Sequence, residues 1–253
     1  MSIPHVIDST NLSTAWCKTL DYIIKKQGKM EVSPLILTLT HFQESLDIRN
    51  ILDEDLQAHK LDNIDTVSET IFPDSLYQFC GRDREELYKR YLKNLPRIKK
   101  VDIRNSKGTY FERLIAFGEI EKVNQLDIII SSLKEDSKVK RRSKLQASIF
   151  DPSKDHTNRP FQGFPCLQHV TFYKSETGGL ILNSFYAIQY LYQRAYGNWL
   201  GLINLGKFVA TEVGMEFERF NCFIGVECLD HLKKNEARRL LEKINSHALF
   251  QLL

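Results

Sequence analysis

The chain has 253 residues and a mass of 29.5 kDa, which corresponds to one large domain or two small ones. Its residues are 42% hydrophobic and 26% charged, an ordinary globular composition that excludes a mainly disordered, collagenous or coiled-coil chain. The net charge of +3, from 35 basic and 32 acidic residues, is too balanced to indicate a nucleic-acid-binding protein. We therefore expect no nucleic acid among its partners.

The pattern of cysteines and the length of the apolar runs indicate the cellular compartment. No apolar run reaches the roughly 18–20 residues of a membrane-spanning helix, and the first residues lack the pattern of a secretory signal. The five cysteines are odd in number, scattered and without a CxxC pair, so they indicate neither a zinc site nor a disulfide framework. We expect a cytoplasmic protein with reduced thiols, without a metal and without a membrane partner.

Hydrophobic spacing in the N-terminal part predicts mainly helices. Apolar residues recur at three- and four-residue intervals in the helical segments, while the strand is a short run of β-branched and apolar residues. The predicted elements are a helix over 14–28, a strand over 31–42, a helix over 66–80 that Pro73 interrupts, and a charged helix over 82–96 that Pro96 closes.

The C-terminal part mixes strands and helices without regular βαβ alternation, which favours an α+β fold in one domain over 1–253. A turn containing Gly178-Gly179 predicts a hairpin between two of the strands. The predicted elements are an amphipathic helix over 120–134, strands over 145–150, 166–173, 180–193 and 217–229, and helices over 201–214 and 231–245.

One constellation of residues suggests chemistry, although the common phosphate-binding, zinc-protease and serine-hydrolase motifs are absent. Cys166 follows Pro165 at the start of a predicted strand, and Arg194 closes the next long strand. Guanidinium groups lower the pKa of a nearby thiol and bind phosphate bidentately, so this pairing suits covalent attack on a phosphorylated substrate. The alternative is that Cys166 is a small buried hydrophobic residue.

The run from about Asn124 to Asp230 resembles thymidylate synthase and the related pyrimidine-nucleotide hydroxymethylases. The matching pieces occur in family order, and they are the segment NQLDIIISSLKEDSKVKRR, the Pro165-Cys166 pair and YQRAYGNWLGL at 192–202. Upstream, GTYFERL at 108–114 resembles the segment that supplies an active-site tyrosine. The resemblance covers a little under half of the chain and leaves the N-terminal part, 1–107, divergent.

The resemblance implies a role for each matched residue. Cys166 would add to C6 of a pyrimidine, Gln193 and Arg194 would bind the nucleotide and its phosphate, and Tyr110 would be the active-site tyrosine. Arg141 and Arg142 would reach the phosphate in the partner subunit, although such a basic run is also typical of a solvated turn. The family's catalytic glutamate would be Glu69, and its base-reading asparagine would fall on Leu205, or on Asn204 after a one-residue slip. A glutamate at a helix start, such as Glu69, is also a common dipole or cap partner.

The family's fold and assembly follow as expectations. The resemblance implies a thymidylate-synthase-like α+β fold, in which helices pack on one face of a large mixed sheet and the bare face packs on a second copy. We therefore expect a homodimer.

The departures from the family pattern concern the cofactor. The family's serine after the QR pair is Ala195, and its pterin-binding aspartate falls on Gly197. The family's ribose-binding DxHxY motif is not found, and Gly225-Val226-Glu227-Cys228 stands near its place. Reduced folate is a possible cofactor, and we expect it to bind weakly or not at all.

Three functional hypotheses follow. The first is an enzyme that modifies a pyrimidine nucleoside monophosphate through Cys166, by methyl or hydroxymethyl transfer to C5 or by hydrolysis of the glycosidic bond. The second is a non-catalytic nucleotide-binding or structural homologue of thymidylate synthase. The third is a protein–protein interaction module that uses only the dimer scaffold.

Overall fold

A computed structural model describes residues 3–135, 141–160 and 162–247. Its centre is a mixed seven-stranded sheet with the strand order β1-β3-β7-β6-β5-β4, in which β2 pairs with the remaining length of β7. β1 is parallel to β3 and β6 is parallel to β7, whereas the other neighbouring pairs are antiparallel. The strands are β1 (His5–Asn11), β2 (Glu31–Val32), β3 (Leu35–Gln43), β4 (Gln146–Ser148), β5 (Leu167–Lys174), β6 (Leu180–Tyr190) and β7 (Phe217–Cys228).

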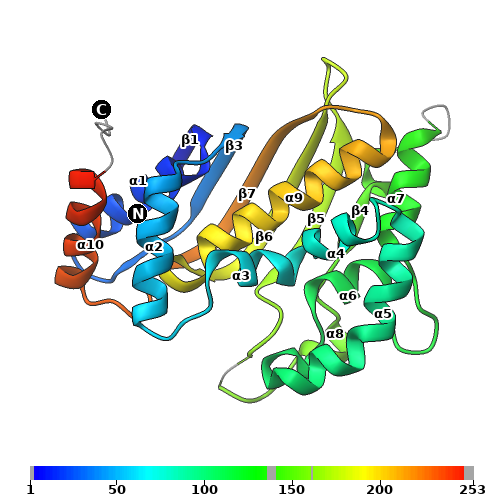
Figure 1. Ribbon diagram of the computed structural model, residues 1–253, viewed down its shortest axis with the longest axis horizontal. Helices are drawn as coiled ribbons and strands as arrows, with labels where there is room; N and C mark the ends of the chain where they lie inside the picture. Colours follow the sequence, from blue (N-terminus) through cyan, green and yellow to red (C-terminus); the bar gives the residue numbers. More distant parts are fainter. Residues whose placement is uncertain (1–2, 136–140, 161, 248–253) are drawn as a thin grey trace.

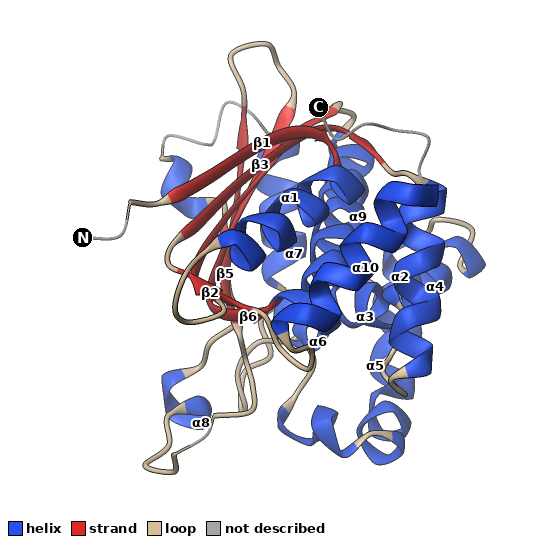
Figure 2. Ribbon diagram, turned by 90° about the vertical axis from the view of Figure 1, so that its left-hand side faces the viewer, coloured by secondary structure: helices blue, strands red, loops and turns tan. Residues whose placement is uncertain are grey.

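Helices cover one face of this sheet (Figures 1 and 2). Helix α9 runs along the sheet and packs against α3, while α1, α2 and α10 lie at the end of the sheet that carries β1 and β3 (Figure 1). The α-helices are α1 (Leu12–Lys25), α2 (Leu46–Ala58), α3 (Ile64–Ile71), α4 (Asp74–Phe79), α5 (Arg84–Val101), α6 (Tyr110–Ile115), α7 (Gln125–Lys134), α8 (Pro152–Asp155), α9 (Tyr196–Val213) and α10 (Lys234–His247). The shorter turns are the 3₁₀ segments η1 (Ile103–Lys107) and η3 (Arg142–Lys144), and the π-helical segment η4 (Leu191–Ala195).

The strands place one set of alternating side chains against the helices. In β3, Leu35, Leu37 and Leu39 are fully buried, and their pairing partners on β7 include the buried Ile224 and Cys222. This period-two pattern is what a sheet covered on one face requires. The mixed sheet with helices on one face confirms the predicted α+β class.

The inward alternation shifts by one residue at the same point in β6 and β7. Buried positions end at Tyr186 and resume at Gln189 in β6, and they end at Ile224 and resume at Glu227 in β7. The pairs Tyr186–Ile224 and Gln189–Glu227 stay in register because both strands shift together. The shift turns two polar side chains toward the helices.

Several predicted boundaries need correction. The strand predicted over 31–42 is divided into β2 and β3, and three other corrections concern α5, α7 and α9. Helix α5 does not close at Pro96 but continues to Val101. Pro96 removes the bond to the carbonyl of Leu92, and because Leu92 lies at the surface, this leaves no acceptor unpaired in the core. Helix α7 begins at Gln125, because the Asn124 side chain accepts the Asp127 N–H as an N-cap.

The third correction concerns the arginine segment. The strand β6 ends at Tyr190, and Gln193 and Arg194 lie in η4 at the start of the next helix rather than at a strand end. Helix α9 consequently starts at Tyr196, before the predicted position 201. Among the described residues, no helix combines the length and apolar character needed to cross a bilayer.

Gly197 lies in the close contact between α9 and α3. A Cβ atom built on it would lie 2.5 Å from the Val67 Cβ and 2.8 Å from the Ile64 carbonyl oxygen. Gly201, one turn later, would place a Cβ 2.7 Å from the Ser68 carbonyl oxygen. The glycine at 197 therefore lets two helix backbones approach each other.

We predict that Gly197→Ala destabilises the protein by about 1–3 kcal/mol, the usual range for overpacking. Alanine would gain about 1 kcal/mol in helix propensity, but the backbone oxygen of Ile64 cannot move away without displacing α3. Urea unfolding followed by circular dichroism measures the difference.

Gly163→Ala is the matched control, because a Cβ at Gly163 meets no atom within 4 Å. If the two variants have equal unfolding midpoints, the α3–α9 contact is looser than described.

Candidate functional site

A cavity of about 850 Å³ lies where the ends of β5 and β6 meet the helical layer. Cys166, Tyr110, Gln193 and Arg194, which come from three separate segments of the chain, all line it. Its other polar lining residues include Asn198 at the start of α9 and Asp62, Asp102 and Arg104 from the N-terminal part. Four residues singled out from the sequence therefore share one concave site of a size typical for small-molecule ligands.

Cys166 and Tyr110 are held together by backbone contacts. The Tyr110 hydroxyl lies against the backbone of Cys166 and Leu167: burial raises its pKa, and the backbone of these two residues opposes the rise. The Cys166 carbonyl oxygen accepts the N–H of Ala187 on β6, at 3.2 Å. Burial raises the pKa of the Cys166 thiol, and the charge of Arg194 opposes this rise without cancelling it. The arginine alone does not make Cys166 a thiolate in the unliganded site.

Arg194 is already paired with a carboxylate. Its guanidinium lies 3.2 Å from the carboxylate of Asp62, which also binds Arg104 at 2.8 Å. Arg104 in turn binds Asp102 at 2.8 Å. The hydrogen bond from Arg104 and the charge of Arg194 hold the pKa of Asp62 below its usual value. An anionic ligand that binds Arg194 must therefore compete with Asp62.

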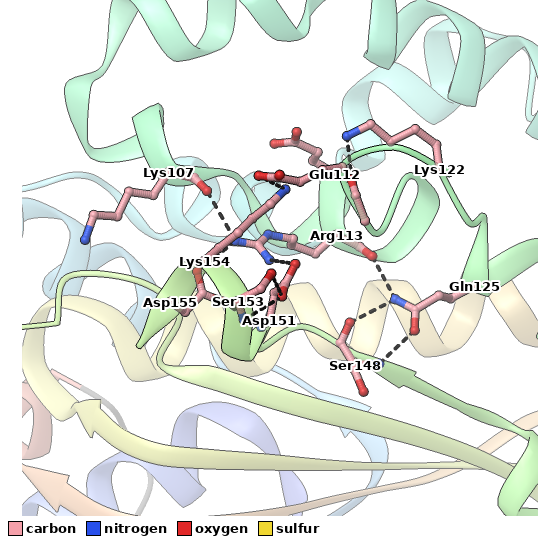
Figure 3. A network of polar contacts seen from close by, with 12 residues as sticks. Lys107, Glu112, Arg113, Lys122, Gln125, Ser148, Asp151, Ser153, Lys154 and Asp155 are labelled. Atoms are coloured by element: carbon pink, nitrogen blue, oxygen red, sulfur yellow. Dashed lines mark hydrogen bonds and ion pairs between the residues drawn. The ribbon is translucent and has the colours of Figure 1, made fainter. Parts of the chain in front are cut away.

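A buried ion-pair network surrounds Arg113, whose polar contacts Figure 3 shows. Arg113 on α6 donates to the Asp155 carboxylate at 2.8 Å and to the Lys107 carbonyl oxygen at 3.3 Å. Its guanidinium also lies 5.5 Å from the ring centre of Phe164, two residues before Cys166. Because α6 also carries Tyr110, the same helix contacts the segment before Cys166 through Arg113 and presents the tyrosine to the cavity.

Glu69 does not line the main cavity. It lines a smaller neighbouring cavity of about 270 Å³ that shares Thr66, Thr70 and Asn94 with the larger one. Its carboxylate accepts the backbone N–H and the hydroxyl of Ser75, each at 2.9 Å, in the first turn of α4. Burial raises the pKa of Glu69, and the two bonds from Ser75 oppose the rise. In these contacts, Glu69 acts as a cap for α4.

Arg141 and Arg142 lie outside the cavity of their own chain. Both are exposed, and the Arg142 guanidinium lies 5.8 Å from the ring centre of Tyr173 on β5. The preceding residues of the basic turn, 138–140, fall outside the described part of the chain. Asn204 is half-buried on α9 and is not among the residues that line the cavity, so its predicted place in the site stays a prediction.

Sequence reasoning missed several lining residues. Asn198 lies four residues after Arg194, one helical turn along, and this spacing was a usable signal. Gln189 was not predicted, because strict alternation of side chains along the strand from Tyr186 would point it away from the helices. Asp62 and Arg104 lie in the divergent N-terminal part, where no motif marks them.

A comparison with models of known protein families gave no match, and a search of curated proteins gave none either. Among the described residues, no group of three or more histidine, cysteine or acidic side chains is placed to hold a metal ion.

We predict that Asp62→Asn increases the reactivity of Cys166. Removing the carboxylate leaves the positive charge of Arg194 uncompensated, and this lowers the pKa of the thiol and increases the thiolate fraction at neutral pH. Alkylation by iodoacetamide, followed by mass spectrometry of the Cys166 peptide across a pH series, should be several-fold faster at neutral pH, with its midpoint at lower pH than in the wild type.

Asp47→Asn, an exposed position at the start of α2, controls for the overall change in charge. An unchanged pH profile in Asp62→Asn would contradict electrostatic control of the thiol by this cluster.

Proposed function

We propose that the protein binds a pyrimidine nucleoside monophosphate in the 850 Å³ cavity and that Cys166 adds to C6 of the base. The observation that carries the proposal is the convergence of Cys166, Tyr110, Gln193 and Arg194 on one cavity. These residues lie far apart in the sequence, and the family resemblance alone relates them there. Their convergence also supports the likeness to thymidylate synthase.

In the proposed addition of the thiolate to the base, each residue acts from the position that it occupies in the cavity. The phosphate binds Arg194 in place of Asp62, with Arg104 and Arg97 also in the lining. The Cys166 thiol loses its proton to solvent, and the thiolate forms a bond to C6. The electron pair of the C5–C6 double bond moves toward C5 and the C4 carbonyl. C5 can then attack a one-carbon electrophile or take up a proton. Loss of a proton from C5 to solvent, together with departure of the thiolate from C6, then restores the C5–C6 double bond. Tyr110 is placed to orient this segment through its contacts with Cys166 and Leu167.

The proposal leaves the outcome at C5 or at the glycosidic bond to be established. Methyl transfer, hydroxymethyl transfer and glycosidic-bond hydrolysis all begin from binding in this cavity.

The residues at the family's folate-binding position do not fit a reduced folate, because they offer no carboxylate to its pterin ring. Gly197 is buried against α3 and offers no carboxylate to the cavity. The carboxylate of Glu212 on α9 binds Arg84 and Tyr77 and does not line the cavity either. We therefore assign no step of the reaction to a folate.

A non-catalytic nucleotide-binding protein is the second candidate. Two observations favour it: burial raises the pKa of Cys166, and Asp62 already neutralises Arg194. Both would leave the thiol mostly protonated in the unliganded protein. The two candidates differ in whether a covalent adduct forms after the nucleotide binds.

We also propose that two copies pack through the outer face of the sheet. The paired aromatic rings of Phe185 and Phe223 on this face are 40% and 42% exposed, and Ile188 is 39% exposed beside them. Adjoining exposed apolar side chains of this size are typical of an interface. Tyr173, under Arg142, also points to this side of β5, so the arginine lies where a second copy would approach.

We predict that uridine or cytidine monophosphate binds with a stoichiometry of one per chain and that Arg194→Gln weakens binding by about tenfold to a hundredfold, the effect of losing a charge-assisted bond. Calorimetry measures the affinity, and native mass spectrometry detects the Cys166 adduct. Arg238→Gln, on the exposed side of α10, is the control.

An adduct that is lost in Cys166→Ala supports the enzyme, whereas tight binding without any adduct favours the non-catalytic candidate. If no nucleotide binds, both are wrong.

We predict that Phe223→Asp converts a dimer into a monomer at micromolar concentration, because a charge would be buried in an apolar contact. Sedimentation equilibrium is the measurement. Phe79→Asp introduces the same change at an exposed site on α4, away from the sheet, and should leave the dimer intact. A wild-type chain that is monomeric would contradict the proposed assembly.

A further inference from the structure

We infer that Gln189 is the specificity-determining residue of the cavity and that its amide nitrogen donates to a carbonyl oxygen at position 4 of the base. The ligand class would then be uracil-type nucleoside monophosphates rather than cytosine-type ones. This inference rests on the proposed function and adds to it the identity of the base.

The orientation of the Gln189 amide follows from its partner. Its Oε1 accepts the indole N–H of Trp199 on α9, at 2.9 Å. An indole nitrogen is only a donor, so the amide oxygen must face Trp199 and the Nε2 group must point elsewhere. The amide therefore presents a donor in a defined direction.

That donor has no partner in the described structure. Gln189 is only 2% exposed, it lines the cavity, and its Nε2 makes no hydrogen bond. Buried amide groups nearly always have a partner, and one that lacks it beside a cavity is poised for an acceptor on a ligand. Gln189 reaches this position because of the shared shift in alternation in β6 and β7.

The neighbouring Glu227 does not take up this donor. Glu227 is paired with Gln189 in the sheet and is fully buried, yet both of its carboxylate oxygens also lack a hydrogen-bond partner. Burial raises its pKa well above the usual value, with the charge of Asp230 acting in the same direction. The described contacts therefore leave the Gln189 amide N–H without a protein partner.

The position of Gln189 in the cavity indicates which edge of the base it meets. The arginines that suit the phosphate are partly open to solvent, with exposed side-chain fractions of 26% for Arg194 and 56% for Arg104. A nucleotide with its phosphate at this open side directs the edge opposite its sugar toward the buried side. There, the carbonyl oxygen at position 4 of uracil accepts from the Gln189 amide. The amino group at position 4 of cytosine is itself a donor and cannot accept from it.

The test compares uridine and cytidine 5′-monophosphates, each in ribo and deoxyribo form, by calorimetry. We expect the wild type to bind the uracil form at least about tenfold more tightly, and Gln189→Glu to reverse the preference because a carboxylate accepts from the cytosine amino group. Gln146→Glu, exposed on β4 of the same sheet, should keep the wild-type ratio.

Circular dichroism establishes that Gln189→Glu is folded. If it is not, Gln189→Leu provides the test, because removing the donor should bring the affinity ratio close to one while binding of both nucleotides persists. Equal wild-type affinity for the two bases, or an unchanged ratio in the variants, overturns the role of Gln189 and leaves the proposed function standing. Absence of binding by either nucleotide overturns both.

Discussion

Helix α9 is packed between the sheet and α3, and most of its residues are buried on every side. Gly197 and Gly201 make this possible, because any side chain at these positions would meet atoms of α3 at less than 3 Å. The helix carries Asn198 and Trp199 in its first turn and begins directly after η4, which carries Arg194. The close approach of the α9 and α3 backbones therefore positions Arg194, Asn198 and Trp199, whose indole binds Gln189. A looser contact would move all of them relative to Cys166.

Two opposing effects set the electrostatics of the cavity. Burial favours the neutral thiol of Cys166, and the guanidinium of Arg194 favours the thiolate. Asp62 weakens the second effect because it pairs with the same arginine. The unliganded site is therefore nearly balanced in charge. Under the proposed function, an arriving phosphate would change that balance close to the thiol and so couple binding of an anion to the protonation of the cysteine.

The inward faces of β6 and β7, which carry Gln189 at the cavity, depart from the usual rule that interior polar groups are paired. Gln189 Nε2, both oxygens of Glu227 and the hydroxyl of Tyr186 lack hydrogen-bond partners, and all of them belong to the inward faces of β6 and β7. Elsewhere in the described core, the inward positions of the same strands are largely apolar. A cluster of unpaired groups at one place is expected where binding, rather than packing, determines the residues.

The sequence alone determined the α+β class, most of the helices and strands, and a short set of reactive residues, because hydrophobic period and turn residues are local properties. It also indicated that Cys166, Tyr110, Gln193 and Arg194 belong together through a resemblance in their order. It could not show that Gly197 is a packing residue or that Glu69 caps α4, since both roles depend on segments distant in the chain. Nor could it place Asp62 beside Arg194, which are far apart in sequence, or turn Gln189 inward. That orientation depends on an alternation shift that two paired strands make together, and only the tertiary structure decides where such a shift occurs.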